Sequence, residues 1–256
     1  MIKFFRKIRQ NLLSEGKTGK YFKYAIGEIV LVVIGILIAL SINNWNESRK
    51  NLKTKINYIE SFKRDLSLDT LDLSNSIKFM KADLDYHLFL SERISSQFAN
   101  KDTLIKIIRF EYSPYFNPAN NLNNKTFEQI NSVGQLNLLD SWMTDLIIKH
   151  NSFQLQMTKV IDMSFVSLYE SLLEFSKKYP IMKQKTDAFG NPLFKNNYGI
   201  LDDQFWRNSN EQELIGAFNG LLSMKIQNQN NIIQVRQYLL NETKKVLDTL
   251  NLAYNN

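Results

Sequence analysis

Apolar residues recur at seven-residue spacing in three long stretches of the chain, over residues 48–98, 137–178 and 209–253. This period is typical of a helix that buries one face against other helices. We therefore predict an all-α domain, an elongated antiparallel bundle of three long helices with short connecting helices. The repeating residues are Ile59, Leu66, Leu73 and Met80, then Leu139, Leu146, Phe153 and Val160, then Ile226, Ile233, Leu240 and Leu247.

Capping residues and prolines mark where helices begin and end. Asp102 and Asn124 are suitable N-caps, and they predict short helices over 102–111 and 124–133. Ser209, three residues before Gln212, predicts a capping box at the start of the last helix. A run of prolines and asparagines around residues 113–124 predicts a loop.

A longer apolar run lies near the N-terminus, over residues 25–42. It has 18 residues with one charge, Glu28, and Tyr24 and Trp45 flank it. About 20 apolar residues cross the hydrocarbon core of a bilayer, and amphipathic aromatic residues favour its interfaces. We predict one transmembrane helix over 24–45. The alternative is a cleaved signal peptide, which the long apolar run disfavours.

Charge predicts the orientation of this segment. The chain carries a net charge of +7, yet residues 1–55 alone carry +8. Seven Lys/Arg precede the apolar run and four follow it, so we expect residues 1–23 in the cytoplasm and residues 46–256 in the periplasm. Residues 1–23 read as a basic amphipathic segment on the inner leaflet, or as a disordered tail. Because the rest of the chain is nearly neutral, we expect no nucleic-acid partner.

The opening sequence, from M-I-K-F-F-R-K-I-R through Y-A-I-G-E-I-V-L-V-V-I-G-I-L-I-A-L-S-I-N-N-W-N-E, resembles a family of single-pass inner-membrane proteins of Gram-negative bacteria. That family is known only as a domain of unknown function. The stretch T-F-E-Q-I-N-S-V-G-Q-L-N-L-L at 126–139 is similar to its internal motif. The resemblance implies a membrane-anchored periplasmic protein. It transfers no catalytic or binding residue.

The residues needed for common catalytic sites are scarce. The chain has no Cys and only two His, which excludes thiol nucleophiles and thiolate metal sites. It contains neither the paired Glu-x-x-His of a di-iron bundle nor a G-x-S-x-G nucleophile turn. We expect a protein that is not an enzyme and holds no cofactor or metal.

Some residues are candidates for contacts with a partner protein. Glu28 in the apolar run either meets a polar group of another membrane chain or extends to the headgroups. Small residues on one helix face favour close helix approach, and exposed loop aromatics either contact a partner or cap the end of the bundle. The candidates are Glu28, Gly35, Ala39, Tyr112, Tyr115 and Phe116.

The two histidines both fall on apolar seams, the rows of apolar residues that run along one face of each predicted helix. His87 continues the 3-4 spacing of the first long stretch, and His150 that of the second. If these two helices are antiparallel neighbours, the imidazoles face each other, with Asp83 one turn from His87. The pair would then be a pH-responsive layer or half of a metal site. The alternative is two separate core histidines, each bonded to a backbone or hydroxyl group.

Two functions agree with these patterns. The first is a membrane-anchored interaction or scaffold module, whose partners are the bilayer and either a second copy or another membrane protein. The second is a sensor that binds a small ligand between helices and signals through a membrane partner. A dry bundle favours the first, and a polar pocket between helices favours the second.

Overall fold

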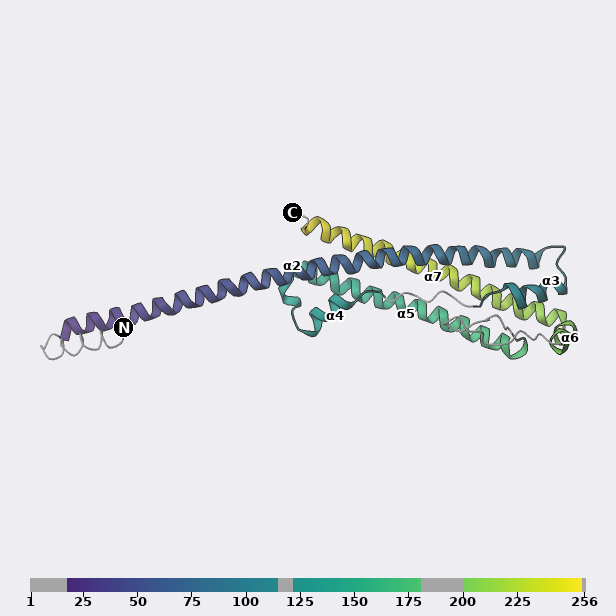
Figure 1. Cartoon of the computed structure of the whole chain (residues 1–256), viewed down its shortest axis with the longest axis horizontal. Helices are drawn as coiled ribbons and strands as arrows, with labels where there is room; N and C mark the ends of the chain where they lie inside the picture. Colours follow the sequence, from purple (N-terminus) through teal and green to yellow (C-terminus); the bar gives the residue numbers. More distant parts are fainter. Residues whose placement is uncertain (1–17, 115–121, 181–199, 255–256) are drawn as a thin grey trace. The chain divides into compact units, whose positions relative to one another are not determined.

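The computed structural model describes residues 18–114, 122–180 and 200–254. These residues form helices without any strand, so the all-α class is confirmed (Figure 1). The chain divides into two units, Met1–Tyr58 and Ile59–Asn256. The helices are α2 (Thr18–Ser95), α3 (Lys101–Lys106), α4 (Lys125–Ser132), α5 (Ser141–Lys178), α6 (Ile200–Asn208) and α7 (Glu211–Tyr254), with a π-helical turn η1 (Ile107–Glu111) and a 3₁₀ turn η2 (Leu136–Leu138).

The described part of the first unit belongs entirely to α2. Its large apolar side chains from Ile26 to Ile42 are all exposed. Exposing Leu, Ile and Val to water on every side of a helix is unfavourable, whereas the same side chains are stable in lipid. α2 is the one described helix that is long and apolar enough to cross a membrane. The same helix continues to Ser95 and supplies the first core helix of the second unit.

In the second unit, α5 runs in the same direction as α2, and α7 runs opposite to both (Figure 1). Gln154 of α5 bonds Asp69 of α2, and farther along both helices Phe175 and Leu90 share one hydrophobic cluster. The predicted antiparallel pairing of the first two long helices is therefore wrong. Only the pairings with α7 are antiparallel.

The connection between α2 and α5 explains this parallel pairing. After α3 and η1, the carbonyl of Ser113 lies beside His87, and farther along the chain Asn123 bonds Asp69. Thr126 then bonds Asp65, one turn earlier on α2. The chain thus returns along α2 to the start of the bundle before α5 begins. A tight hairpin would have produced the antiparallel pair that we expected.

The core confirms the predicted α2 seam, because Ile59, Leu66, Leu73 and Met80 are all buried. On α7 the predicted Ile233 and Leu240 are buried, so that seam is confirmed in part, whereas on α5 the buried face is displaced from the prediction. The buried seven-residue repeat of α5 is Ile147, Gln154, Ile161, Leu168 and Phe175, whereas the predicted Val160 is exposed. Ile226 and Leu247 of α7 are only half-buried. Polar residues occupy the true seams, which made the neighbouring apolar positions look like the repeat.

The short helices match their predicted positions, but two predicted caps are wrong. Asn100, rather than Asp102, caps α3, and its side-chain oxygen accepts a bond from the Thr103 amide at 2.9 Å. Asn210, rather than Ser209, accepts from the Glu213 amide at 3.1 Å. α4 follows Asn124 as predicted, but the Asn124 side chain makes no capping hydrogen bond. In each wrong case an Asn immediately before the helix satisfies the free amides.

Asp69 links three segments of the second unit. It is 1 % exposed, accepts bonds from the backbone and side chain of Asn123 at 2.8 Å, and accepts one from Gln154 at 3.1 Å. Burial raises the pKa of this carboxyl, and the bonds from Asn123 and Gln154 oppose that rise. Asp69 therefore holds the return segment and α5 against α2.

We predict that Asp69→Ala lowers the free energy of unfolding by about 2–3 kcal/mol, because it leaves buried donors without an acceptor. The matched control is Asp85→Ala on the exposed face of the same helix, which should change it by less than about 0.5 kcal/mol. Urea unfolding of the detergent-solubilised chain measures both. Equal losses in the two variants would contradict the role of Asp69.

Candidate functional site

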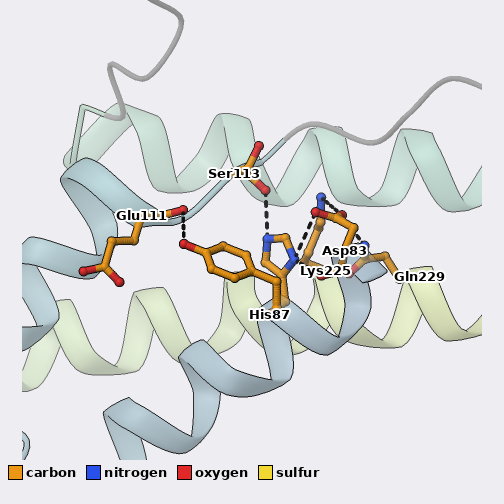
Figure 2. A network of polar contacts seen from close by, with 7 residues as sticks. Asp83, His87, Glu111, Ser113, Lys225 and Gln229 are labelled. Atoms are coloured by element: carbon orange, nitrogen blue, oxygen red, sulfur yellow. Dashed lines mark hydrogen bonds and ion pairs between the residues drawn. The ribbon is translucent and has the colours of Figure 1, made fainter. Parts of the chain in front are cut away.

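Polar side chains from α2 and α7 meet inside the apolar core and form the candidate site. Asp83 and His87 lie one turn apart on α2, and Lys225 and Gln229 lie one turn apart on α7. Residues four apart in a helix lie on the same face, so each pair points across the interface (Figure 2). We call these four residues the polar cluster.

Asp83 accepts the polar contacts of both α7 residues. The Lys225 ammonium lies 3.4 Å from one carboxylate oxygen of Asp83, and the amide of Gln229 donates to the same oxygen. Lys225 and Gln229 are fully buried, whereas the Asp83 side chain is 36 % exposed. The cluster therefore has one carboxylate that reaches solvent and an ammonium that does not.

Burial of Lys225 changes its acid–base behaviour. Desolvation lowers the pKa of Lys225 to about 8, and the nearby Asp83 carboxylate opposes that shift. Leaving a buried ammonium without its carboxylate costs several kcal/mol, so the pair has to stay together or lose its charge. Lys225 is therefore an amine inside the core with a pKa of about 8, well below that of an exposed lysine.

His87 lies next to this ion pair, and each ring nitrogen faces a backbone carbonyl oxygen. A neutral imidazole has one N–H and donates to one of the two carbonyls, whereas the protonated ring donates to both. Nδ1 lies 2.6 Å from the Asp83 carbonyl oxygen, and Nε2 lies 3.1 Å from the Ser113 carbonyl oxygen. The ring packs edge-on against Tyr86 and Tyr112. Burial is the main cause that lowers the pKa of His87, and Lys225 adds to it, whereas the two carbonyls and Asp83 oppose it.

This geometry suits proton binding, because a buried amine and a buried imidazole lie beside one carboxylate. The acceptors around the His87 ring are backbone carbonyls. Within the described ranges, no group of three or more His, Asp or Glu side chains is arranged to hold a metal. The cluster is thus a candidate for fixing helix register and for responding to pH.

The predicted pairing of the two histidines does not occur in the structure. His150 lies in a small cavity of about 20 Å³ with Leu66 of α2 and Val246 of α7. Val246 lies 21 residues from Lys225 on α7, which is about 30 Å along a helix. The two imidazoles therefore occupy opposite parts of the bundle, because α5 runs parallel to α2 rather than antiparallel.

The structure also locates the other predicted contact residues. Gly35 and Ala39 are exposed on α2, and Glu28 is half-buried. Tyr112 is fully buried, edge-on to Phe218, which agrees with a loop aromatic that packs onto the bundle. Tyr115 and Phe116 lie outside the described residues.

Sequence reasoning missed Lys225 and treated Gln229 only as part of the polar run Gln227–Asn231. The sequence allowed two interpretations of that run, a solvated turn or a polar layer that fixes the register of the helices. Asn228 and Gln229 are buried, and Asn228 donates to the Ser164 carbonyl at 3.0 Å, which favours the polar layer. The available signal was the four- and seven-residue spacing of the polar residues themselves, at Lys225, Gln229, Arg236 and Thr243.

We predict that the bundle loses stability in acid through His150. Burial lowers the pKa of His150 to about 4, so the unfolded state binds more protons than the folded state between that pH and about 6.5. The free energy of unfolding should fall by about 2 kcal/mol from pH 7 to pH 5 through this residue. His150→Leu should remove that part of the fall, as measured by urea unfolding at both pH values. An unchanged pH dependence would contradict the prediction.

Comparison with known protein families finds a similarity that covers part of this site. A model described as Family of unknown function (DUF6090) matches residues 28–126. No curated protein and no solved structure matches the chain. The family match includes Asp83 and His87 but ends before α5 and α7, and it does not reach most of the 126–139 stretch. The chain is therefore similar, over its first half, to a family without an assigned function, and the α7 side of the polar cluster lies beyond that similarity.

Proposed function

We propose that the protein is a non-enzymatic, membrane-anchored interaction module. In this proposal α2 crosses the inner membrane of a bacterium, residues 1–23 are cytoplasmic, and residues 46–256 form a periplasmic bundle that binds other envelope proteins. The observation that carries the proposal is a row of exposed apolar side chains on the outer face of α2.

This row, the outer stripe, lies on the bundle part of α2. Its members recur mostly at three- or four-residue steps, with Asn75 and Ala82 at the intervening positions. Their exposed fractions range from 40 % to 64 %. Contiguous exposed apolar surface on a folded domain marks an interaction site, and an amphipathic helix fits such a row. The outer stripe consists of Leu68, Leu71, Phe79, Tyr86 and Phe89.

Anchoring rests on composition and exposure together. The apolar run of α2 is exposed on all sides, and basic residues are more numerous before it than after it. Lys and Arg remain on the cytoplasmic side of a membrane helix, which supports a periplasmic bundle. Because the same helix continues into the bundle, a partner that binds the outer stripe is held near the membrane.

The polar cluster favours a second candidate function, a sensor that signals through a membrane partner. A buried Lys and a buried His beside one carboxylate form a layer whose charge depends on pH. A change in that charge alters the packing of α7 on α2. This alternative predicts partner binding that changes with pH, whereas a scaffold binds its partner at a constant level.

We predict that a cysteine introduced at Ser223, an exposed position on α7, reacts with a membrane-impermeant thiol reagent in intact spheroplasts. The natural chain has no Cys, so the background is zero. A cysteine at Ser14, in the segment before the apolar run, should react only after lysis. The reverse pattern would place the bundle in the cytoplasm.

We predict that affinity capture from native membranes recovers a protein partner, and that Phe79→Glu reduces its yield about tenfold, because a buried charge at an interface costs more than 1.4 kcal/mol. The control Lys81→Glu also changes charge on an exposed residue, but it lies outside the outer stripe and should leave the yield unchanged.

Equal yields from the two variants would contradict a role of the outer stripe in binding. A yield that changes between about pH 7 and pH 9, where Lys225 loses its proton, and that Lys225→Met makes constant, would favour the sensor over the scaffold.

A further inference from the structure

The buried seam of α2 continues, in the same register, into a part of the helix that nothing in the described structure covers. Ile59 is the first buried seam residue, at 2 % exposed. Going back along the helix in steps of three, four and seven residues, the next apolar positions are Ile56, Leu52 and Trp45, which are 51 %, 57 % and 66 % exposed. We call these three residues the lower seam.

The buried part of the α2 seam begins near the positions where α7 ends and α5 begins. The carbonyl of Tyr254, the last residue of α7, accepts a bond from Lys63 at 3.5 Å. The Tyr254 hydroxyl donates to Asp140, the residue before α5, at 2.5 Å, and its ring stacks on Trp142. The end of α7 and the start of α5 therefore lie beside the first residues of α2 in the second unit, and the apolar repeat of α2 itself extends through the residues before Ile59.

We propose that the lower seam pairs with the lower seam of a second copy of this chain, as a short parallel two-stranded coiled coil. A seven-residue repeat with Trp45 and Leu52 seven residues apart, and Ile56 four residues farther on, is the pattern that such pairing requires. The repeat also runs down into the apolar segment, where Ile38 and Gly35 continue it. One face of α2 thus packs against α5 and α7 above Ile59 and against its own copy below.

A second copy fits better than an unrelated helix because of the membrane. This inference rests on the proposed anchoring, since two copies in one bilayer present Leu52 at the same height, about 15 Å beyond the end of the apolar run at Ile42. Register and direction are then fixed before the helices touch. Two heptads bind weakly in solution, but anchoring in the same membrane raises the effective concentration of one segment at the other.

The charges beside the seam give the pairing a salt dependence. Arg49 occupies a seam position with its guanidinium over the Trp45 ring, 6.0 Å from the centroid, and Lys53 and Lys55 flank the seam. A parallel pair brings like charges together, which opposes association at low ionic strength. Since exposed charges are screened within about 8 Å at physiological salt, added salt should strengthen the pairing.

Disulfide crosslinking tests the proposal directly, because the chain has no cysteine of its own. Single cysteines are placed at Leu52 and Ile56 in the full chain in native membranes, with Asn51→Cys and Asn57→Cys as matched controls. Each control lies one residue from its seam position, at the same height but on another exposed face. Disulfides form only when the two Cα atoms come within about 7 Å, so Leu52→Cys and Ile56→Cys should give crosslinked homodimer about tenfold faster than the controls.

The crosslinking rate at Leu52→Cys should also increase about twofold or more when ionic strength rises from about 0.01 M to about 0.15 M, as screening removes the repulsion. Similar rates at seam and control positions, or a crosslinked product with the mass of another protein, would overturn the self-pairing. A carbonate wash of the same membranes distinguishes failure of the self-pairing from failure of the anchoring. Protein that remains in the membrane without seam-specific crosslinks contradicts the coiled coil alone. Protein that washes off contradicts the proposed anchoring and the register that depends on it.

Discussion

The bundle depends on one constraint, that a charge removed from water has to face an opposite charge or a hydrogen-bonding partner. Lys225 is fully buried on the seam of α7, and Asp83 on α2 is the carboxylate that neutralises it. A shift of α7 by one turn would place Lys225 against Met80 or His87 and leave the ammonium without its carboxylate. The apolar residues make the helices adhere, but this pair and the Asp69–Gln154 bond select one alignment among several that apolar packing alone would allow.

Helix positions were predictable because periodicity and helix-breaking residues are local properties of the sequence. The α2 seam at Ile59, Leu66, Leu73 and Met80 and the position of α4 after Asn124 followed from those rules. The seam of α5 was displaced and that of α7 was found only in part, because Gln154, Lys225 and Arg236 occupy buried positions that a hydrophobicity pattern assigns to solvent. A polar residue is stable there only with a partner from another helix, and sequence spacing does not reveal that partner.

The direction of α5 was unpredictable for a related reason. Whether two helices pair parallel or antiparallel depends on the path of the segment between them, and that path is fixed here by long-range bonds such as those of Asn123 to Asp69 and Thr126 to Asp65. Of the candidate site, the α2 residues were predictable from the sequence and the α7 residues were not. His87 and Asp83 stood out as a histidine and a carboxylate one turn apart, whereas their α7 partners lie about 140 residues away in sequence.

The order of the helices along the chain has a consequence for biosynthesis. Ile161 of α5 shares a cluster with Ile77 of α2 and is made about 85 residues later, whereas Ile232 and Leu239 of α7 follow about 155 residues after Ile77. At about 5–20 residues per second, the part of the α2 face that α7 covers stays without that partner for about ten to thirty seconds. The core of this bundle is therefore completed only when the last helix is made.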